Sequence, residues 1–233
     1  MTSSSIKDYA TALNLLRGRE SDLETFTTYA PSNRFIEAFI DPQNLSFSVK
    51  DEDGSTFAMA LGKEPEIIKC DRLATSRGLS IDANRFEHRA DWDFYSIDTA
   101  NFAPQKICEI SSDAAEISAF LTMHAPNSSV WPNDPEILFW GEVRKENDLA
   151  ALGALVQWRT GQVMFASIAT HSDYRNQGLA QNLVKEMLSR AAKMGLVHVG
   201  LGVFAENLSA KRAYEKVGFS LVNEFSSYNF VGG

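Results

Sequence analysis

Apolar positions near the start of the chain repeat at helical spacing. Residues 6–17 place apolar side chains along one helix face, and Gly18 is a typical helix end. Ser21 predicts the N-cap of a second helix, whose apolar stripe is interrupted at Pro31 and resumes over residues 35–40. The chain is therefore predicted to begin with helices.

Strands are predicted to follow these helices. Residues 45–49 alternate apolar and polar side chains, residues 51–54 form an acidic turn ending in glycine, and residues 57–61 are apolar. Two short strands around such a turn predict a hairpin. The pattern weakens over residues 67–97, and the proline-containing residues 98–106 predict a linker.

Helices and strands alternate more clearly in the second half of the chain. The expected elements are a helix over 112–124, a long loop over 125–135, strands over 137–143, 149–158 and 163–170, a helix over 177–193, a strand over 197–204, a helix over 208–216 and a strand over 219–230. This order predicts an α/β (α+β) fold with a mixed, mostly antiparallel central sheet flanked by helices.

The two halves differ enough to predict two domains. Residues 1–106 form a smaller α+β region, and residues 107–233 form the second domain. The first region carries an aromatic cluster at residues 92–95. We interpret residues 1–106 either as a diverged copy of the second half or as a domain on the substrate side.

Composition excludes several classes of protein. A net charge of -8 and an isoelectric point of about 5.1 argue against a nucleic-acid binder. Cys70 and Cys108 have neither disulfide-scaffold nor metal-ligand spacing, so no metal is expected. The chain shows no signal peptide and no long apolar run, which predicts a soluble, cytoplasmic protein with no membrane partner.

The residues between a predicted strand and a predicted helix indicate an anion site. Residues 174–180 read Tyr-Arg-Asn-Gln-Gly-Leu-Ala. A helix N-terminus presents free N–H groups and a positive dipole end, and Gly178 lets a phosphate approach the backbone. A Walker loop is excluded because no Lys follows Gly178, and a dinucleotide fingerprint is excluded because two of its three glycines are missing.

A second segment of the sequence makes the functional assignment of this loop specific. Residues 175–180 resemble the acyl-CoA motif Gln/Arg-x-x-Gly-x-Gly/Ala of the GNAT superfamily of N-acetyltransferases. Residues 207–219 are similar to the family's Asn-x-x-Ala-x-x-x-Tyr-x-x-x-Gly-Phe segment, which lies on the short helix after the fifth strand. Residues 128–132 and 226–228 also resemble the glycine-acyltransferase-like branch of the family.

The resemblance implies acetyl-CoA as co-substrate and assigns residues to it. The residues implied in cofactor binding are Ile168, Ala169, Thr170, Arg175, Asn176, Gln177, Gly178, Leu179, Ala180, Asn207 and Ser209. Tyr214 is implied as the general acid that protonates the departing thiolate. The reaction implied is direct attack of a primary amine, from a small molecule or a peptide, on the thioester.

The general base departs from the family pattern. Family members place a carboxylate at positions that correspond to Met164 or Gly202, and both positions lack one here. We therefore expect a water-mediated base. Glu142 is the first choice to hold the water, and Glu224 and Asp134 are the alternatives. A solvent-facing strand carboxylate is an equally good interpretation of Glu142.

A different function stays open on sequence grounds. The missing carboxylates also suit an acyl-CoA-binding sensor or scaffold without turnover, whereas Tyr214 favours the enzyme. The sequence does not name the acceptor or fix the acyl length. It also leaves open whether the chain forms a homodimer.

Overall fold

The computed structural model describes residues 4–102 and 112–232, so the predicted boundary after residue 106 and Cys108 lie outside the described part. The chain forms two compact units. Unit 1 contains the described residues up to Phe94, Phe204–Glu206 and those from Leu221 onward, and unit 2 contains the described residues of Tyr95–Val203 and Asn207–Ser220. The last strand of the chain thus belongs to unit 1.

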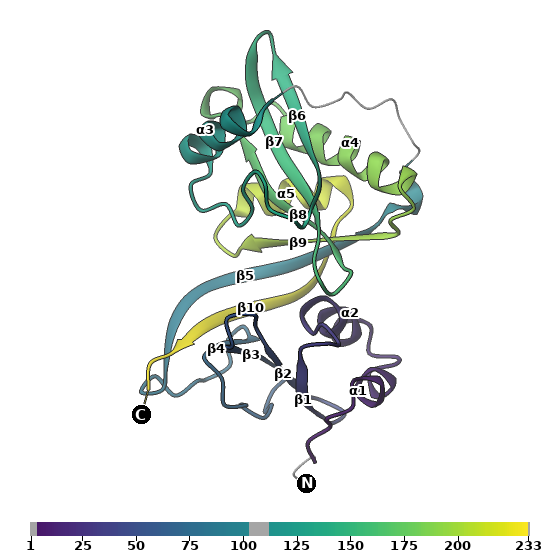
Figure 1. The fold of residues 1–233 in the computed structure, drawn as a ribbon, viewed down its shortest axis with the longest axis vertical. Helices are drawn as coiled ribbons and strands as arrows, with labels where there is room; N and C mark the ends of the chain where they lie inside the picture. The colour runs from purple at the N-terminus through teal and green to yellow at the C-terminus, as the bar shows by residue number, and fades with distance from the viewer. Residues whose placement is uncertain (1–3, 103–111, 233) are drawn as a thin grey trace. The chain divides into compact units, whose positions relative to one another are not determined.

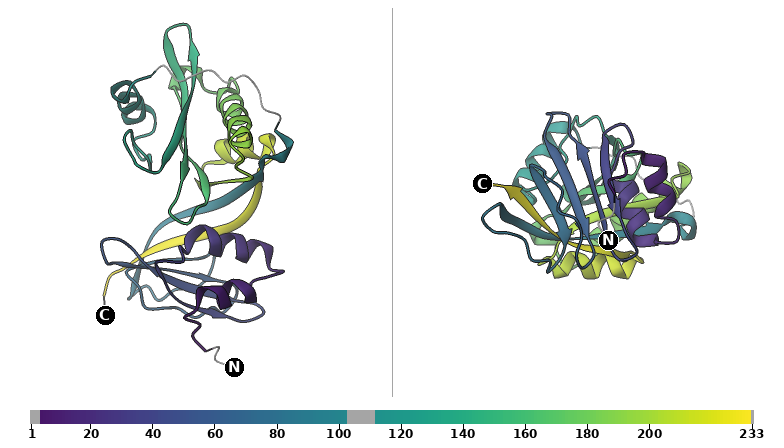
Figure 2. Two further views of the ribbon diagram at one scale, coloured as in Figure 1. Left: turned by 45° about the vertical axis from the view of Figure 1, so that its right-hand side comes forward. Right: turned by 90° about the horizontal axis from the view of Figure 1, so that it is seen from below.

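Unit 1 is a sheet with two helices beside it. Its elements are α1 (Tyr9–Leu15), α2 (Glu20–Tyr29), β1 (Phe35–Ile40), β2 (Leu45–Lys50), β3 (Thr56–Leu61), β4 (Arg72–Ser76), most of β5 (Phe86–Asp98) and β10 (Ser220–Phe230). The strand order is β1-β2-β3-β4-β10-β5, and β3 and β4 run parallel. Figures 1 and 2 show α1 and α2 together on one side of the strands β1–β3.

The prediction that residues 35–40 are helical is wrong. They form β1, which pairs antiparallel with β2, and the predicted hairpin of β2 and β3 is confirmed. The run Phe-Ile-Glu-Ala-Phe-Ile fits both helical and strand spacing, and its aromatic and β-branched residues favour a strand. Likewise α2 begins at Glu20 after the N-cap Arg19, so Ser21 is not its cap.

The segment with the weak pattern contains two strands that the sequence did not reveal. β4 covers Arg72–Ser76, and β5 runs for 13 residues over Phe86–Asp98. Polar and charged residues occupy most of the exposed and half-buried positions of β5, whereas Phe94 and Tyr95 are buried. An element of this kind shows no strict alternation, because the burial changes along its length.

Unit 2 follows the predicted order closely. Its elements are the end of β5, the 3-10 helix η1 (Thr99–Asn101), α3 (Ala114–His124), β6 (Ile137–Lys145), β7 (Asp148–Gln157), β8 (Val163–Thr170), the 3-10 helix η2 (Ser172–Tyr174), α4 (Leu179–Lys193), β9 (His198–Phe204) and α5 (Leu208–Val217). Its strand order is β5-β9-β8-β7-β6. The predicted fold class, a mixed and mostly antiparallel sheet flanked by helices, is confirmed.

Helices cover both faces of the unit 2 sheet. Figures 1 and 2 show α3 and α4 on opposite sides of β6 and β7. The α4 face packs Leu183, Val184 and Met187 against strand residues such as Leu155 and Phe165. The α3 face packs its own cluster around Leu121, Leu152 and Ala169. Neighbouring residues of β7 and β8 therefore contribute to two separate cores.

Candidate active site

The parallel strands β8 and β9 pair over a short stretch. Met164 lies opposite Gly200 and Phe165 lies opposite Leu201, and the pairing ends there although β8 continues to Thr170. The backbone of the remaining β8 residues is therefore not paired with β9. Such an exposed strand edge can accept an extended ligand through main-chain hydrogen bonds.

A bulge shapes β8 at the same place. Ser167 has a left-handed φ of 53°, and the register between β7 and β8 shifts between Leu152 and Ala154. The Ser167 Oγ donates to the Val130 carbonyl at 2.7 Å and accepts from the Val130 N–H at 3.2 Å. One side chain thus fixes the bulge against the loop that follows α3.

The loop between β8 and α4 forms a set of free N–H groups. Asn176 and Gly178 are both left-handed, with φ of 62° and 76°. In the described part of the chain, the N–H groups of residues 176–181 have no protein acceptor. A Cβ built on Gly178 would meet no atom within 4 Å. Alternating left-handed residues at a helix N-terminus form a concave anion site.

Helix α5 supplies the opposite wall. The Asn207 side chain accepts from the Ala210 N–H at 3.1 Å and caps the helix, which ends at the left-handed Gly218. Tyr214 is only 9% exposed, and burial raises the pKa of its hydroxyl to about 12. No hydrogen-bond partner of this hydroxyl is found among the described residues.

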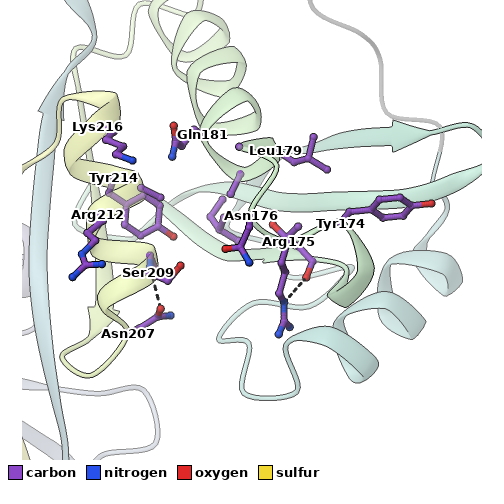
Figure 3. A pocket seen from close by; sticks show the side chains of 16 residues that line it. Tyr174, Arg175, Asn176, Leu179, Gln181, Asn207, Ser209, Arg212, Tyr214 and Lys216 are labelled. Atoms are coloured by element: carbon purple, nitrogen blue, oxygen red, sulfur yellow. Dashed lines mark hydrogen bonds between the residues drawn. The ribbon is translucent and has the colours of Figure 1, made fainter.

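These elements enclose one cavity of about 690 Å³. It is lined by Ile168, Thr170, Tyr174, Arg175, Asn176, Gly178, Leu179, Ala180, Gln181, Asn207, Ser209, Ala210, Arg212, Ala213, Tyr214 and Lys216. Figure 3 shows the α5 side chains on one side and the loop residues Asn176 and Arg175 on the other. The strand edge, the anion loop and the tyrosine therefore share a single space.

The sequence model of the Acetyltransferase (GNAT) family matches residues 105–219, which span all of these elements. Residues 105–219 are a GNAT acetyltransferase domain. The chain accordingly carries an acyltransferase domain, of a family that moves an acyl group from acetyl-CoA to an acceptor.

Solved GNAT structures share the fold over nearly the whole chain. A GNAT-family protein from Novosphingobium aromaticivorans is 17% identical with a TM-score of 0.53, and the alignment covers 94% of this chain and 96% of that one. A GCN5-related N-acetyltransferase from Kribbella flavida is 15% identical with a TM-score of 0.54, covering 93% and 96%. No curated protein matches the sequence. At these identities the likeness establishes the fold and leaves the acceptor open.

Most residues that the sequence assigned to the cofactor line the cavity of the GNAT domain. These are Ile168, Thr170, Arg175, Asn176, Gly178, Leu179, Ala180, Asn207 and Ser209, together with the predicted acid Tyr214. Ala169 instead points into the core beneath α3, and the Gln177 amide lies 3.5 Å from the Asp173 carbonyl. The Gln177 N–H has no acceptor among the described residues, whereas Ala169 lies opposite Leu152 in the β7–β8 pair. The predicted roles of both residues stay predictions.

Glu142 lies away from the cavity. Its carboxylate accepts from the Ser112 N–H at 3.2 Å and from the Ser112 hydroxyl at 2.5 Å, and the Arg144 Nε lies 3.4 Å from its other oxygen. Its side chain is 7% exposed. These contacts join β6 to the residues before α3, which is a structural environment. The role of Glu142 in holding the base water stays a prediction that no contact supports.

Several lining residues of the GNAT domain were not assigned from the sequence. They are Tyr174, Gln181, Ala210, Arg212, Ala213 and Lys216. A signal for the α5 residues was present, because Ala210, Ala213 and Tyr214 recur at the three- and four-residue spacing of one helix face. The small alanines leave room for a ligand on that face.

Other expectations meet the structure as follows. Cys70 is a free, buried thiol. Within residues 4–102 and 112–232, no group of three or more His, Cys, Asp or Glu side chains could hold a metal ion. None of the helices in these same ranges has the length and apolar character needed to cross a membrane. The resemblance to the glycine-acyltransferase-like branch stays a prediction.

Proposed function

We propose that the protein transfers an acetyl group from acetyl-CoA to a primary amine of a small molecule or peptide, by direct attack on the thioester. The observation that carries this proposal is the single cavity in which the free β8 edge, the anion loop and the Tyr214 hydroxyl meet. Acyl transfer needs a bound acyl donor, a polarised carbonyl and a stabilised leaving thiol. Each of these has a candidate group in the cavity.

The groups that line the cavity suggest one orientation for the proposed cofactor. The diphosphate would accept hydrogen bonds from the N–H groups of residues 176–181, assisted by the positive end of α4. Arg175, whose Nε donates to the Thr170 carbonyl at 3.3 Å, lies beside them. The pantetheine arm would then pair with the β8 backbone near Ile168 and Thr170. This places the thioester between the separating strands.

Tyr214 is the proposed acid. Because burial raises its pKa to about 12, the hydroxyl is protonated at neutral pH. An ordinary thiol has a pKa of about 8.5, so the thiol is the stronger acid. Tyr214 would therefore stabilise the departing sulfur chiefly by donating a hydrogen bond as negative charge develops there.

The amine must lose a proton before or during attack. An ordinary alkyl amine has a pKa of about 10, so most of it is protonated at neutral pH. Among the described residues, the cavity lining contains no carboxylate. Proton removal by water is therefore proposed, as the sequence predicted. The predicted placement of residues 1–106 on the acceptor side stays a prediction.

The lack of a carboxylate in the described cavity lining favours a second candidate function. A protein that binds acetyl-CoA as a sensor needs the anion loop and the strand edge but no base. A cavity whose described lining lacks a carboxylate suits that function as well. The two candidates agree on the cofactor and differ on turnover.

Two measurements on the full-length protein separate them. Acetyl-CoA should raise the melting temperature, because a ligand that binds only the folded state stabilises it. Release of free thiol is then followed with a panel of primary amines. Amine-dependent thiol release supports the transferase. Stabilisation without release for every amine favours the sensor, and the absence of stabilisation rejects both.

A further inference from the structure

A glycine in the middle of β7 gives another side chain room beside the cavity. Gly153 is buried, and a Cβ added to it would overlap the Ile168 Cδ1 and lie 3.6 Å from the Leu183 Cδ2. Its φ is not left-handed, so the backbone alone does not require glycine. A glycine inside a strand often marks a place where another group approaches the backbone closely. Here that group is the Ile168 side chain.

The bulge in β8 places Ile168 over this glycine. At the register shift between β7 and β8, Gly153 alone faces both Ser167 and Ile168, which is the pattern of a bulge. The Ser167 hydroxyl is bonded to Val130, in the loop after α3. The Ile168 side chain instead packs against the core under α4 and also lines the cavity. Ile168 is therefore a wall between that core and the cavity.

The acyl end of the proposed cofactor would lie against this wall. The free N–H groups follow the C-terminal end of β8, so a cofactor that runs back along this strand passes Thr170 before it reaches Ile168. These two are the β8 residues that line the cavity. Further back along β8, Phe165 pairs with Leu201 and joins β8 to β9, and both residues are buried. An acyl group therefore has little room beyond Ile168.

We propose that Ile168 and Gly153 together limit the acyl donor to short, unbranched acyl groups, such as acetyl and propionyl. Ile168 is the residue that the end of the acyl chain contacts. Gly153 is a positioning residue, because it leaves room for the Ile168 Cδ1 outside the cavity. The inference rests on the proposed function, since it assumes that an acyl-CoA occupies the cavity. One methylene group too many in an apolar pocket costs about 10- to 200-fold in specificity, so the position of this wall decides the chain length.

The first test is calorimetric titration of the full chain with acetyl-CoA and with butyryl-CoA, which needs no amine and no turnover. The wild type should bind acetyl-CoA about tenfold or more tightly than butyryl-CoA. Ile168→Ala removes most of the wall, so its affinities for the two compounds should agree within about twofold. Ile117→Ala makes the same truncation in the separate core on the α3 face, and it should keep the preference of the wild type.

The second test moves the wall in the opposite direction. Gly153→Ala displaces the Ile168 Cδ1 toward the cavity, so acetyl-CoA should bind about tenfold more weakly. Coenzyme A, which has no acyl group, should change less than about twofold. Ile168→Val removes the displaced atom, so the double variant should regain most of the lost affinity for acetyl-CoA. Gly141→Ala is the control, because its added Cβ would crowd Met187 and Leu183 instead.

Each outcome supports or overturns a stated part. If the wild type binds neither coenzyme A nor acetyl-CoA, the proposed function fails and the inference fails with it. Equal binding of acetyl-CoA and butyryl-CoA by the wild type, or an unchanged preference in Ile168→Ala, overturns the inference alone. If Gly153→Ala weakens coenzyme A and acetyl-CoA equally, or if Ile168→Val does not rescue it, Gly153 has no positioning role. Melting temperatures show which variants fold, and if Gly153→Ala does not fold, the result for Ile168→Ala decides the inference.

Discussion

Each unit of the protein contains a parallel pair of strands, and the two pairs end differently. In unit 1, β3 and β4 stay paired through four positions, from Phe57 opposite Arg72 to Ala60 opposite Thr75. In unit 2, the pairing of β8 and β9 ends after Phe165, although β8 continues to Thr170. The first pair is a closed part of a sheet, whereas the second leaves a strand edge free.

The N–H groups that follow each strand show the same contrast. After β3, the Gly62 N–H donates to the Ser76 hydroxyl at 3.0 Å and the Glu64 N–H donates to the Asn44 side chain at 3.0 Å. After β8, the N–H groups of residues 176–181 have no acceptor in the described chain and lie at the start of α4. A site therefore forms where a strand edge and a helix N-terminus are left unsatisfied together.

A substitution of Gly178, in the loop of free N–H groups after β8, should have the largest effect, which is a loss of cofactor binding. Gly178→Glu places a carboxylate where the diphosphate is proposed to lie, and like charges in contact cost several kcal/mol, or about 1000-fold in affinity. Binding of acetyl-CoA, measured by calorimetry, should become undetectable. Gly161→Glu is the matched control, because Gly161 has a φ of 85° and nothing within 4 Å of an added Cβ. Equal affinity in the two variants would contradict the loop assignment.

A substitution in the aromatic core of unit 1 should lower the stability of the protein without changing its affinity for acetyl-CoA. Phe225 is fully buried on β10, and its ring centroid lies 4.4 Å from that of Trp92 and 6.2 Å from that of Tyr29. Phe225→Ala should lower the free energy of unfolding by about 3–5 kcal/mol, because it leaves a cavity among large rings.

Chemical denaturation measures this loss, with Phe204→Ala as the control. Phe204 is 47% exposed, so its removal should change stability by less than about 0.5 kcal/mol. The folded Phe225→Ala variant should bind acetyl-CoA as the wild type does. A weaker affinity in the folded variant would show that the aromatic core of unit 1 contributes to cofactor binding.

The sequence predicted unit 2 better than unit 1 for a physical reason. The elements of unit 2 are separated by turn residues. Its helices show one apolar face, and the strand β7 is a continuous apolar run, so the pattern identifies them. In unit 1, the strand Phe35–Ile40 carries apolar residues at positions that also fit a helix, and only its pairing with β2 decides the matter. Long-range pairing of this kind cannot be found from local spacing.

The sequence predicted those residues of the candidate site that lie in short, recognisable motifs. Gly178 and Tyr214 lie in segments whose spacing is specific, and both line the cavity. Arg212 and Lys216 look like ordinary exposed cations of an amphipathic helix until the cavity places them. Glu142 was chosen for its strand position alone, and its contacts with Ser112 and Arg144 depend on α3, which local sequence does not place.

A substitution of Tyr214 should have a smaller effect than the two changes above. Tyr214→Phe keeps the ring, its packing and the edge contact with Phe219 at 5.9 Å, and removes the hydroxyl. The rate constant kcat should fall about 100-fold with little change in KM for acetyl-CoA, because the hydrogen bond to sulfur forms in the transition state. Tyr174→Phe is the control, because Tyr174 also lines the cavity but its hydroxyl donates to Asp148 at 2.7 Å. A Tyr214→Phe rate within about twofold of the wild type would assign the tyrosine to packing.

The smallest expected effect distinguishes the two strand ends by pH. His171 directly follows β8, and its ring centroid lies 4.2 Å from that of His124 on α3. The N–H groups after β3 are instead held by serine and asparagine side chains that do not titrate. Burial lowers the pKa of His124 below 6.5, and His171 and Arg175 lower it further, although Asp173 opposes them. The neutral ring therefore stabilises the fold above about pH 6.5, and this stabilisation is lost as the pH falls toward the folded-state pKa, because the unfolded chain binds the proton more tightly.

Urea denaturation between about pH 7.5 and about pH 5 should show that His124→Gln loses less stability than the wild type. The difference should be under about 1 kcal/mol, because water screens the half-buried rings. The variant His198→Gln, which removes an exposed imidazole on β9, should follow the wild type. If His124→Gln also follows the wild type, the histidine contact contributes no pH dependence, and the two strand ends differ only in their free N–H groups.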